Sequence, residues 1–121
     1  MATKRILIID DNPEFRTAAR QLLERHGFVV VAEAETGIGG IAKAKEHHPD
    51  LVLLDFQLPD IDGFEVAERL SRLEVPVDVI LTSSLGGSDF GTLVAGSSAL
   101  GFVPKAELSA SAIEALRSPG R

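Results

Sequence analysis

The chain has 121 residues, a net charge of −6 and no cysteine. This length allows one domain with a hydrophobic core and is too short for two. The acidic balance argues against a nucleic-acid-binding surface, which would carry a basic stripe, and the lack of cysteine excludes disulfides, thiol catalysis and thiolate zinc sites. The first apolar run, residues 6–9, is short and followed by acids, so it predicts neither a signal peptide nor a membrane span. We therefore expect a cytoplasmic protein.

Five short runs of apolar or β-branched residues indicate strands. They lie at residues 6–9, 28–32, 51–54, 77–82 and 102–103. The run at 51–54 reads LVLL and is apolar throughout. Such a run is typical of a strand that is buried on both faces of a sheet.

Helical patterns fill the intervals between these strands. Asn12 followed by Pro13 predicts the start of the first helix, and Gly27 predicts its end. Thr36 can cap the second helix, although the glycines that follow it weaken helix formation. The spacing predicts that the second helix turns Ile38, together with residues 41 and 42, toward the core.

The carboxyl-terminal half continues the alternation. Asp62 or Gly63 can start the third helix, and apolar residues at helical spacing predict a last helix over 107–116. The segment 83–101 is rich in glycine and serine, so a helix around 89–96 would have low intrinsic propensity. We expect that helix to be present but weak.

Five strand–helix units predict an α/β fold with a parallel sheet. Right-handed crossovers place helices on both faces, which gives a three-layer, doubly wound (βα)5 sandwich. One common strand order in such folds is 2-1-3-4-5, the flavodoxin-like order, and we adopt it from known folds. No linker or repeat interrupts the chain, so we expect a single domain over residues 1–121.

Polar side chains follow four of these strands. Asp10 and Asp11 come after the first strand, Asp55 after the third, Thr82 ends the fourth and Lys105 follows the fifth. In the order 2-1-3-4-5 these four strands are neighbours, so the side chains converge on one edge. Three close carboxylates repel one another unless a divalent cation intervenes, and all-oxygen ligands favour Mg²⁺. A carboxylate nucleophile, Mg²⁺ and a lysine match phosphoryl transfer onto one of the three acids.

Motifs at these positions agree with one family in order and spacing along the whole chain. The acid pair is Asp10-Asp11, the loop at 55–63 reads D-x-x-L-P-x-x-D-G, and ILTS and GFVPK occupy 80–83 and 101–105. With these motifs the chain resembles a response-regulator receiver domain of two-component phosphorelay signalling, in the CheY-like superfamily. One such motif alone is a weak signal, whereas several in register are specific.

The resemblance implies roles for four residues in the acidic cluster. Asp55 would be the phosphoacceptor. Asp10, Asp11, Asp55 and the backbone carbonyl of Gln57 would hold Mg²⁺, or Mn²⁺ in its place. No other cofactor is implied.

The resemblance also implies a switch. Thr82 would hydrogen-bond a phosphoryl oxygen, and Lys105 would pair with another. Thr82 would then move inward and Phe102, which stands where the family commonly has a tyrosine, would follow. The face of helix 4, strand 5 and helix 5 would change, and the same face would serve any homodimer. The donor would be a histidine kinase or a phosphotransfer protein, and the downstream partner is not readable.

Three other functions on this fold remain for comparison. An aspartyl-phosphate phosphatase would show D-x-D after the first strand and a large cap domain, and this chain has neither. A flavin-binding module would need a Ser/Thr/Gly-rich phosphate loop where this chain has acids. A phosphorylation-independent interaction module stays open as the alternative, since only the complete acidic set speaks against it. We expect no enzyme activity beyond the chain's own phosphorylation and dephosphorylation.

Two further features lie outside the switch. Asp60-Ile61-Asp62-Gly63 suggests a calcium loop, but the EF-hand register fails, so Asp60 and Asp62 are interpreted as loop and cap residues. After Leu116 the sequence reads RSPGR, with no effector domain behind it. We expect a stand-alone receiver, with a receiver cut from a larger regulator as the alternative.

Overall fold

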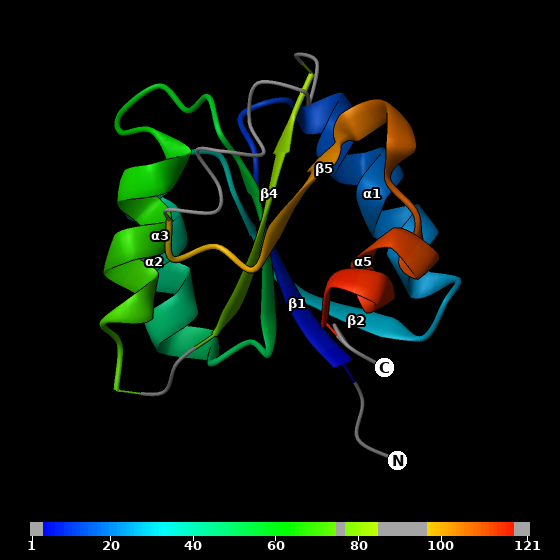
Figure 1. Ribbon diagram of the computed structural model, residues 1–121, viewed down its shortest axis with the longest axis horizontal. Helices are drawn as coiled ribbons and strands as arrows, with labels where there is room; N and C mark the ends of the chain where they lie inside the picture. Colours follow the sequence, from blue (N-terminus) through cyan, green and yellow to red (C-terminus); the bar gives the residue numbers. More distant parts are fainter. Residues whose placement is uncertain (1–3, 75–76, 85–96, 118–121) are drawn as a thin grey trace.

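The computed structural model describes residues 4–74, 77–84 and 97–117. Within these ranges, parallel strands form one sheet in the order β2-β1-β3-β4-β5 (Figure 1). The strands are β1 (Lys4–Ile9), β2 (Phe28–Ala34), β3 (Leu51–Asp55), β4 (Asp78–Ser83) and β5 (Gly101–Pro104). The predicted flavodoxin-like order and the all-parallel sheet are confirmed.

Backbone pairing carries the strands past their apolar runs. Glu33 and Ala34 still pair with β1, although the apolar pattern of β2 ends before them. Asp55 pairs with Thr82, so the carboxylate belongs to β3 itself and does not follow it. The strand β3 therefore ends in a polar residue whose backbone is held by the sheet.

Helices cover both faces of the sheet, as predicted. They are α1 (Pro13–Glu24), α2 (Gly37–His47), α3 (Gly63–Ser71), the short 3₁₀ helix η1 (Lys105–Glu107) and α5 (Ala110–Arg117). Figure 1 shows α2 and α3 on one face and α1 and α5 on the other. None of the helices in the described part of the chain has the length and apolar character of a membrane span.

The central strand β3 contributes to both halves of the core. Val52 and Leu54 pack in the cluster under α2 and α3, whereas Leu51 and Leu53 pack in the cluster under α1 and α5. All five residues of β3 are buried, Asp55 included. The strand predicted to be buried on both faces is therefore confirmed.

Most helix starts agree with the sequence patterns. Asn12 caps α1 by accepting hydrogen bonds from two backbone N–H groups, and Asp62 caps α3 with Gly63 as its first residue. The predicted start of the last helix is wrong, because residues 105–107 form a 3₁₀ turn and α5 begins only at Ala110. Ser109 sets that start, since its Oγ accepts the Ala112 N–H at 3.0 Å.

The predicted inner face of α2 is only partly correct. Ile41 is buried, but Ile38 and Ala42 are exposed. Glycine makes up much of the buried face: a Cβ on Gly40 would overlap the side chain of Ile9. The helix α2 thus lies close to β1 because Gly40 has no side chain on the face toward β1. A prediction of the inner face from large apolar residues misses such a glycine. The weak helix predicted around 89–96 lies outside the described residues.

Gly63 connects the fold to the end of β3. Its N–H donates to the Phe56 carbonyl at 2.8 Å, and an added Cβ would lie 2.8 Å from Phe56 Cα and 3.1 Å from the Asp55 carbonyl oxygen. These backbone atoms can yield only if the end of β3 moves. We predict that Gly63→Ala lowers the free energy of unfolding by about 1–3 kcal/mol, through overpacking. Urea denaturation measures this, and unchanged or increased stability, as helix propensity alone would give, would contradict it.

Candidate functional site

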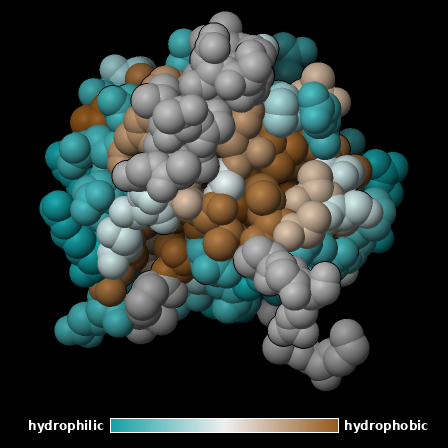
Figure 2. Space-filling view, in the orientation of Figure 1, coloured by the Kyte–Doolittle hydropathy of each residue, from teal (hydrophilic) through white to brown (hydrophobic). Residues whose placement is uncertain are grey.

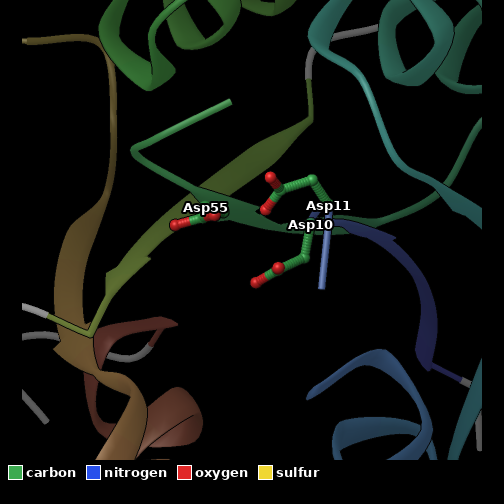
Figure 3. Close-up of side chains that lie close together, drawn as sticks. All are labelled: Asp10, Asp11 and Asp55. Atoms are coloured by element: carbon green, nitrogen blue, oxygen red, sulfur yellow. The ribbon is translucent and has the colours of Figure 1, made fainter. Parts of the chain in front are cut away.

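Three carboxylates meet where β1 and β3 end. One oxygen each from Asp10, Asp11 and Asp55 lies within 4.8 Å of the others (Figure 3). The register that pairs Ile9 with Leu54 places the residue after β1 beside the last residue of β3. Asp10 and Asp55 are buried, whereas Asp11 is exposed. The cluster therefore has two desolvated acids and one that faces solvent.

Lys105 brings a positive charge to this cluster from the end of β5. Its Nζ lies 2.8 Å from Asp10 Oδ2 and 3.7 Å from Asp55 Oδ2. The same Nζ lies 4.5 Å from the centroid of the Phe15 ring on α1, within cation–π range. The ammonium is thus held between an acid and an aromatic ring, and its closest charge partner is Asp10.

The remaining residues predicted for the site surround Asp55. Thr82 lies opposite Asp55 on β4, is fully buried, and donates from Oγ1 to the Leu54 carbonyl at 3.4 Å. The exposed Gln57 donates its backbone N–H to Asp55 Oδ1 at 3.3 Å. Phe102, on β5, is partly buried and packs against the cluster under α2 and α3. The structure brings Asp10, Asp11, Asp55, Thr82, Gln57 and Lys105 to one edge, with Phe102 on the adjoining strand.

The charges at this edge do not balance. Burial, and then the negative charge of Asp10, raise the pKa of Asp55 to about 6, against the opposing effect of Lys105. Among the described residues, the buried Oδ2 of Asp10 accepts no hydrogen bond, and the Lys105 ammonium is its ion-pair partner. A buried carboxylate oxygen that lacks a hydrogen bond, close to two further carboxylates, suits a hard divalent cation such as Mg²⁺. The residues present therefore fit the predicted metal.

Arg16 on α1 is not among the predicted site residues, yet it contacts the site. Its Nη1 donates to the Asp10 carbonyl, and its Nε lies 3.1 Å from Glu33 Oε1. Glu33 is shared with Arg20, whose Nη1 lies 2.6 Å from Oε2. This network fixes the backbone of Asp10 from α1 and β2. In the sequence, this network shows itself as an acid, Glu33, near the end of a predicted strand, and that feature is too common to indicate such a network.

The fold is a doubly wound parallel sheet with three carboxylates and a lysine at its carboxyl edge, the edge at which open parallel sheets bind ligands. The family model described as the response regulator receiver domain matches residues 6–117. The chain therefore belongs to the response-regulator receiver domain family, and the resemblance inferred from its motifs is confirmed.

Individual relatives agree with this assignment. The chain is 43% identical over 103 residues to BvgA of Bordetella pertussis, a transcription regulator of virulence factors, covering 85% of this chain and 49% of BvgA. It is 39% identical over 82 residues to the chemotaxis protein CheY of Bacillus subtilis, covering 68% of each chain. The signal receiver domain of NarL from Mycobacterium tuberculosis aligns over 100% of both chains, with a TM-score of 0.84 and 29% identity. The chain spans about half the length of BvgA and of similar curated relatives.

The raised pKa of Asp55 predicts how its charge affects stability without a divalent cation. Because the pKa of Asp55 in the folded protein, about 6, exceeds the ordinary aspartate pKa of 3.8, ionisation of this carboxylate lowers stability as the pH rises from 3.8 to about 6. Full burial would make this about 3 kcal/mol, and solvent screening reduces it. We predict that Asp55→Asn increases the free energy of unfolding by about 1–2 kcal/mol above pH ~6.5 in EDTA, and that the difference disappears below pH ~4.

Urea titrations of both proteins across this pH range provide the measurement. Asp11→Asn is the matched control, because it removes an exposed charge of the same cluster and should change stability much less. Equal stability of Asp55→Asn and wild type at neutral pH would contradict the prediction.

Proposed function

We propose that this chain is a phospho-accepting signalling switch. It takes a phosphoryl group onto Asp55 from a histidine kinase or a phosphotransfer protein, with Mg²⁺ bound. One observation carries this proposal: the poorly solvated Asp55 carboxylate lies among Asp10, Asp11 and the Lys105 ammonium at one edge of the sheet. Membership of the receiver family supports the class of donor.

Each residue has a defined part in the transfer. Asp10, Asp11, Asp55 and the Gln57 carbonyl would hold the cation, which when bound offsets negative charge on phosphoryl oxygens. An Asp55 carboxylate oxygen attacks phosphorus in line, and the bond from phosphorus to the donor breaks. Lys105 stabilises the negative charge that gathers on the phosphoryl oxygens, because its ammonium already lies 3.7 Å from Asp55 Oδ2.

The response begins at the strand beside Asp55. A phosphoryl group adds roughly two negative charges and new acceptor oxygens. Within the described residues, the Thr82 hydroxyl donates to the Leu54 carbonyl at 3.4 Å, a long distance for such a bond, so a phosphoryl oxygen is a better acceptor for it. Val103 pairs with Thr82 and adjoins Phe102, which gives the movement a route to β5.

The output surface in this proposal is the face that includes β5 and α5. Figure 2 shows apolar side chains gathered over β4 and β5, between α3 and α5, and Leu100 is 37% exposed. This face would meet the downstream partner, or a second copy of the chain in a homodimer. The predicted fourth helix, which would complete the face, lies outside the described residues. The chain would work in the cytoplasm and catalyse only its own phosphorylation and dephosphorylation.

A small acyl phosphate with Mg²⁺ tests the proposal directly. We expect intact-mass measurement to show one phosphoryl group on the wild type and none on Asp55→Asn. Asp78→Asn is the matched control, because Asp78 lies at the opposite end of the sheet, and it should be modified like the wild type. An adduct that persists without Asp55 would refute the assignment, and no adduct at all would favour the phosphorylation-independent module.

Beryllofluoride with Mg²⁺ provides a second test through binding alone. A ligand that binds only the folded state adds stability, about 2.7 kcal/mol at one hundred times its dissociation constant. We predict a higher melting temperature for the wild type in the presence of both, and a much smaller shift for Lys105→Met. If beryllofluoride and Mg²⁺ leave the melting temperature of the wild type unchanged, the site does not bind the phosphoryl analogue and the proposal is contradicted.

A further inference from the structure

The loop between β3 and α3 supplies part of the cap of a different helix. Asp60 accepts the Gly37 N–H at Oδ1 and the Ile38 N–H at Oδ2, both at 2.8 Å. Thr36 caps the next group, since its Oγ1 accepts the Gly39 N–H, and its carbonyl accepts the Gly40 N–H in the first i→i−4 bond of the helix. The N–H groups of the first three residues of α2, which have no partner within the helix, are therefore all paired.

A steric fit accompanies these hydrogen bonds. A Cβ on the buried Gly37 would lie 2.7 Å from Ile61 Cγ1 and 2.8 Å from Val66 Cγ2. Ile61 directly follows Asp60, so glycine at position 37 is what allows this loop to reach the amino end of α2. The polar contact and the close packing thus point to the same docked position of the loop.

The loop also leads into the candidate site. It begins directly after Asp55 and includes Gln57, whose N–H donates to Asp55 Oδ1. Phe56 fixes the first part of the loop, since its N–H donates to the Thr82 carbonyl at 2.9 Å and its carbonyl accepts from Gly63 at 2.8 Å. Between these points, the carboxylate of Asp60 is the polar tie to α2. Desolvation opposes ionisation of Asp60, but hydrogen bonds from backbone N–H groups, those of Ile38 and Gly37 first among them, together outweigh it and lower the pKa of Asp60.

We infer that Asp60 is a positioning residue, which clamps the β3–α3 loop to α2 and so holds the Gln57 backbone where a cation between Asp10, Asp11 and Asp55 would use it. The inference rests on the proposed function, because it concerns the same cation. Removing partners that orient metal ligands typically costs about 10–100-fold in metal affinity. Replacing Asp60 should therefore lower the affinity for Mg²⁺ by more than the accompanying loss of folding stability would explain.

The experiment compares Asp60→Ala with Thr36→Ala in the full chain. Both remove capping from the amino end of α2, but only Asp60→Ala releases the loop. Calorimetric titration should give a dissociation constant for Mg²⁺ raised about tenfold in Asp60→Ala and almost unchanged in Thr36→Ala. Asp60→Asn, which keeps one acceptor oxygen, should lie between Asp60→Ala and the wild type.

Two further readouts separate positioning from general destabilisation. In metal-free protein, the Gly37 and Ile38 amides should exchange faster in Asp60→Ala, which tests the clamp without any metal. With acyl phosphate, Asp60→Ala should need about ten times more Mg²⁺ for half-maximal phosphorylation and reach a similar rate at saturation.

The outcomes distinguish this inference from the function on which it rests. Wild-type Mg²⁺ affinity in Asp60→Ala, or equal weakening in Thr36→Ala, would overturn the inference and leave the proposed function standing. A wild type that binds no Mg²⁺ and forms no adduct would overturn both.

Discussion

The structure depends on an unbalanced group of charges at the end of a fully buried strand. Asp10 is 0% exposed and Asp55 is 5% exposed, so water cannot separate them from each other. One ammonium, that of Lys105, faces both acids, and Asp11 adds a third negative charge at the surface. In such a place burial disfavours the charged form of an acid, so the acid either binds a proton or needs a nearby cation. The fold therefore holds its proposed nucleophile in a state that a divalent cation would stabilise.

The parts of the molecule around this cluster act mainly to keep it in place. Lys105 is held between Asp10 and the ring of Phe15, so α1 helps to orient a residue that follows β5. Arg16 bonds the backbone of Asp10 and is itself held by Glu33. These contacts come from separate elements, so the geometry of the cluster is a property of the whole sheet and its flanking helices. If these contacts were lost, the short distances between the carboxylates and the Lys105 ammonium would increase, and the proposed phosphoryl transfer depends on them.

The sequence predicted the features that follow from local pattern. Apolar runs located the strands, and the polar residues that end them identified the cluster, because parallel strands share a carboxyl edge. Prediction failed for two different reasons. The inner face of α2 includes Gly40, which admits Ile9 from a distant strand, a contact that the local pattern does not show. The start of α5 at Ala110 depends on a local signal, the Ser109 cap, which the apolar spacing of the segment does not reveal. The strand order itself came from known folds, since no pattern in the residues states which strands are neighbours.

The register of the sheet explains how one charge could reach a distant surface. Asp55 pairs with Thr82, and Thr82 pairs with Val103, so a single row of residues crosses from β3 to β5. Neighbouring residues in a strand point to opposite faces, and Phe102 therefore lies on the other side of β5 from Val103. Lys105 follows the same strand and contacts the cluster directly. Under the proposed function, phosphorylation would act on β5 at two points, through the Thr82 hydroxyl and through the Lys105 ammonium. Two points of attachment on a short strand favour movement of the strand as a unit, which suits a two-state response better than a graded one.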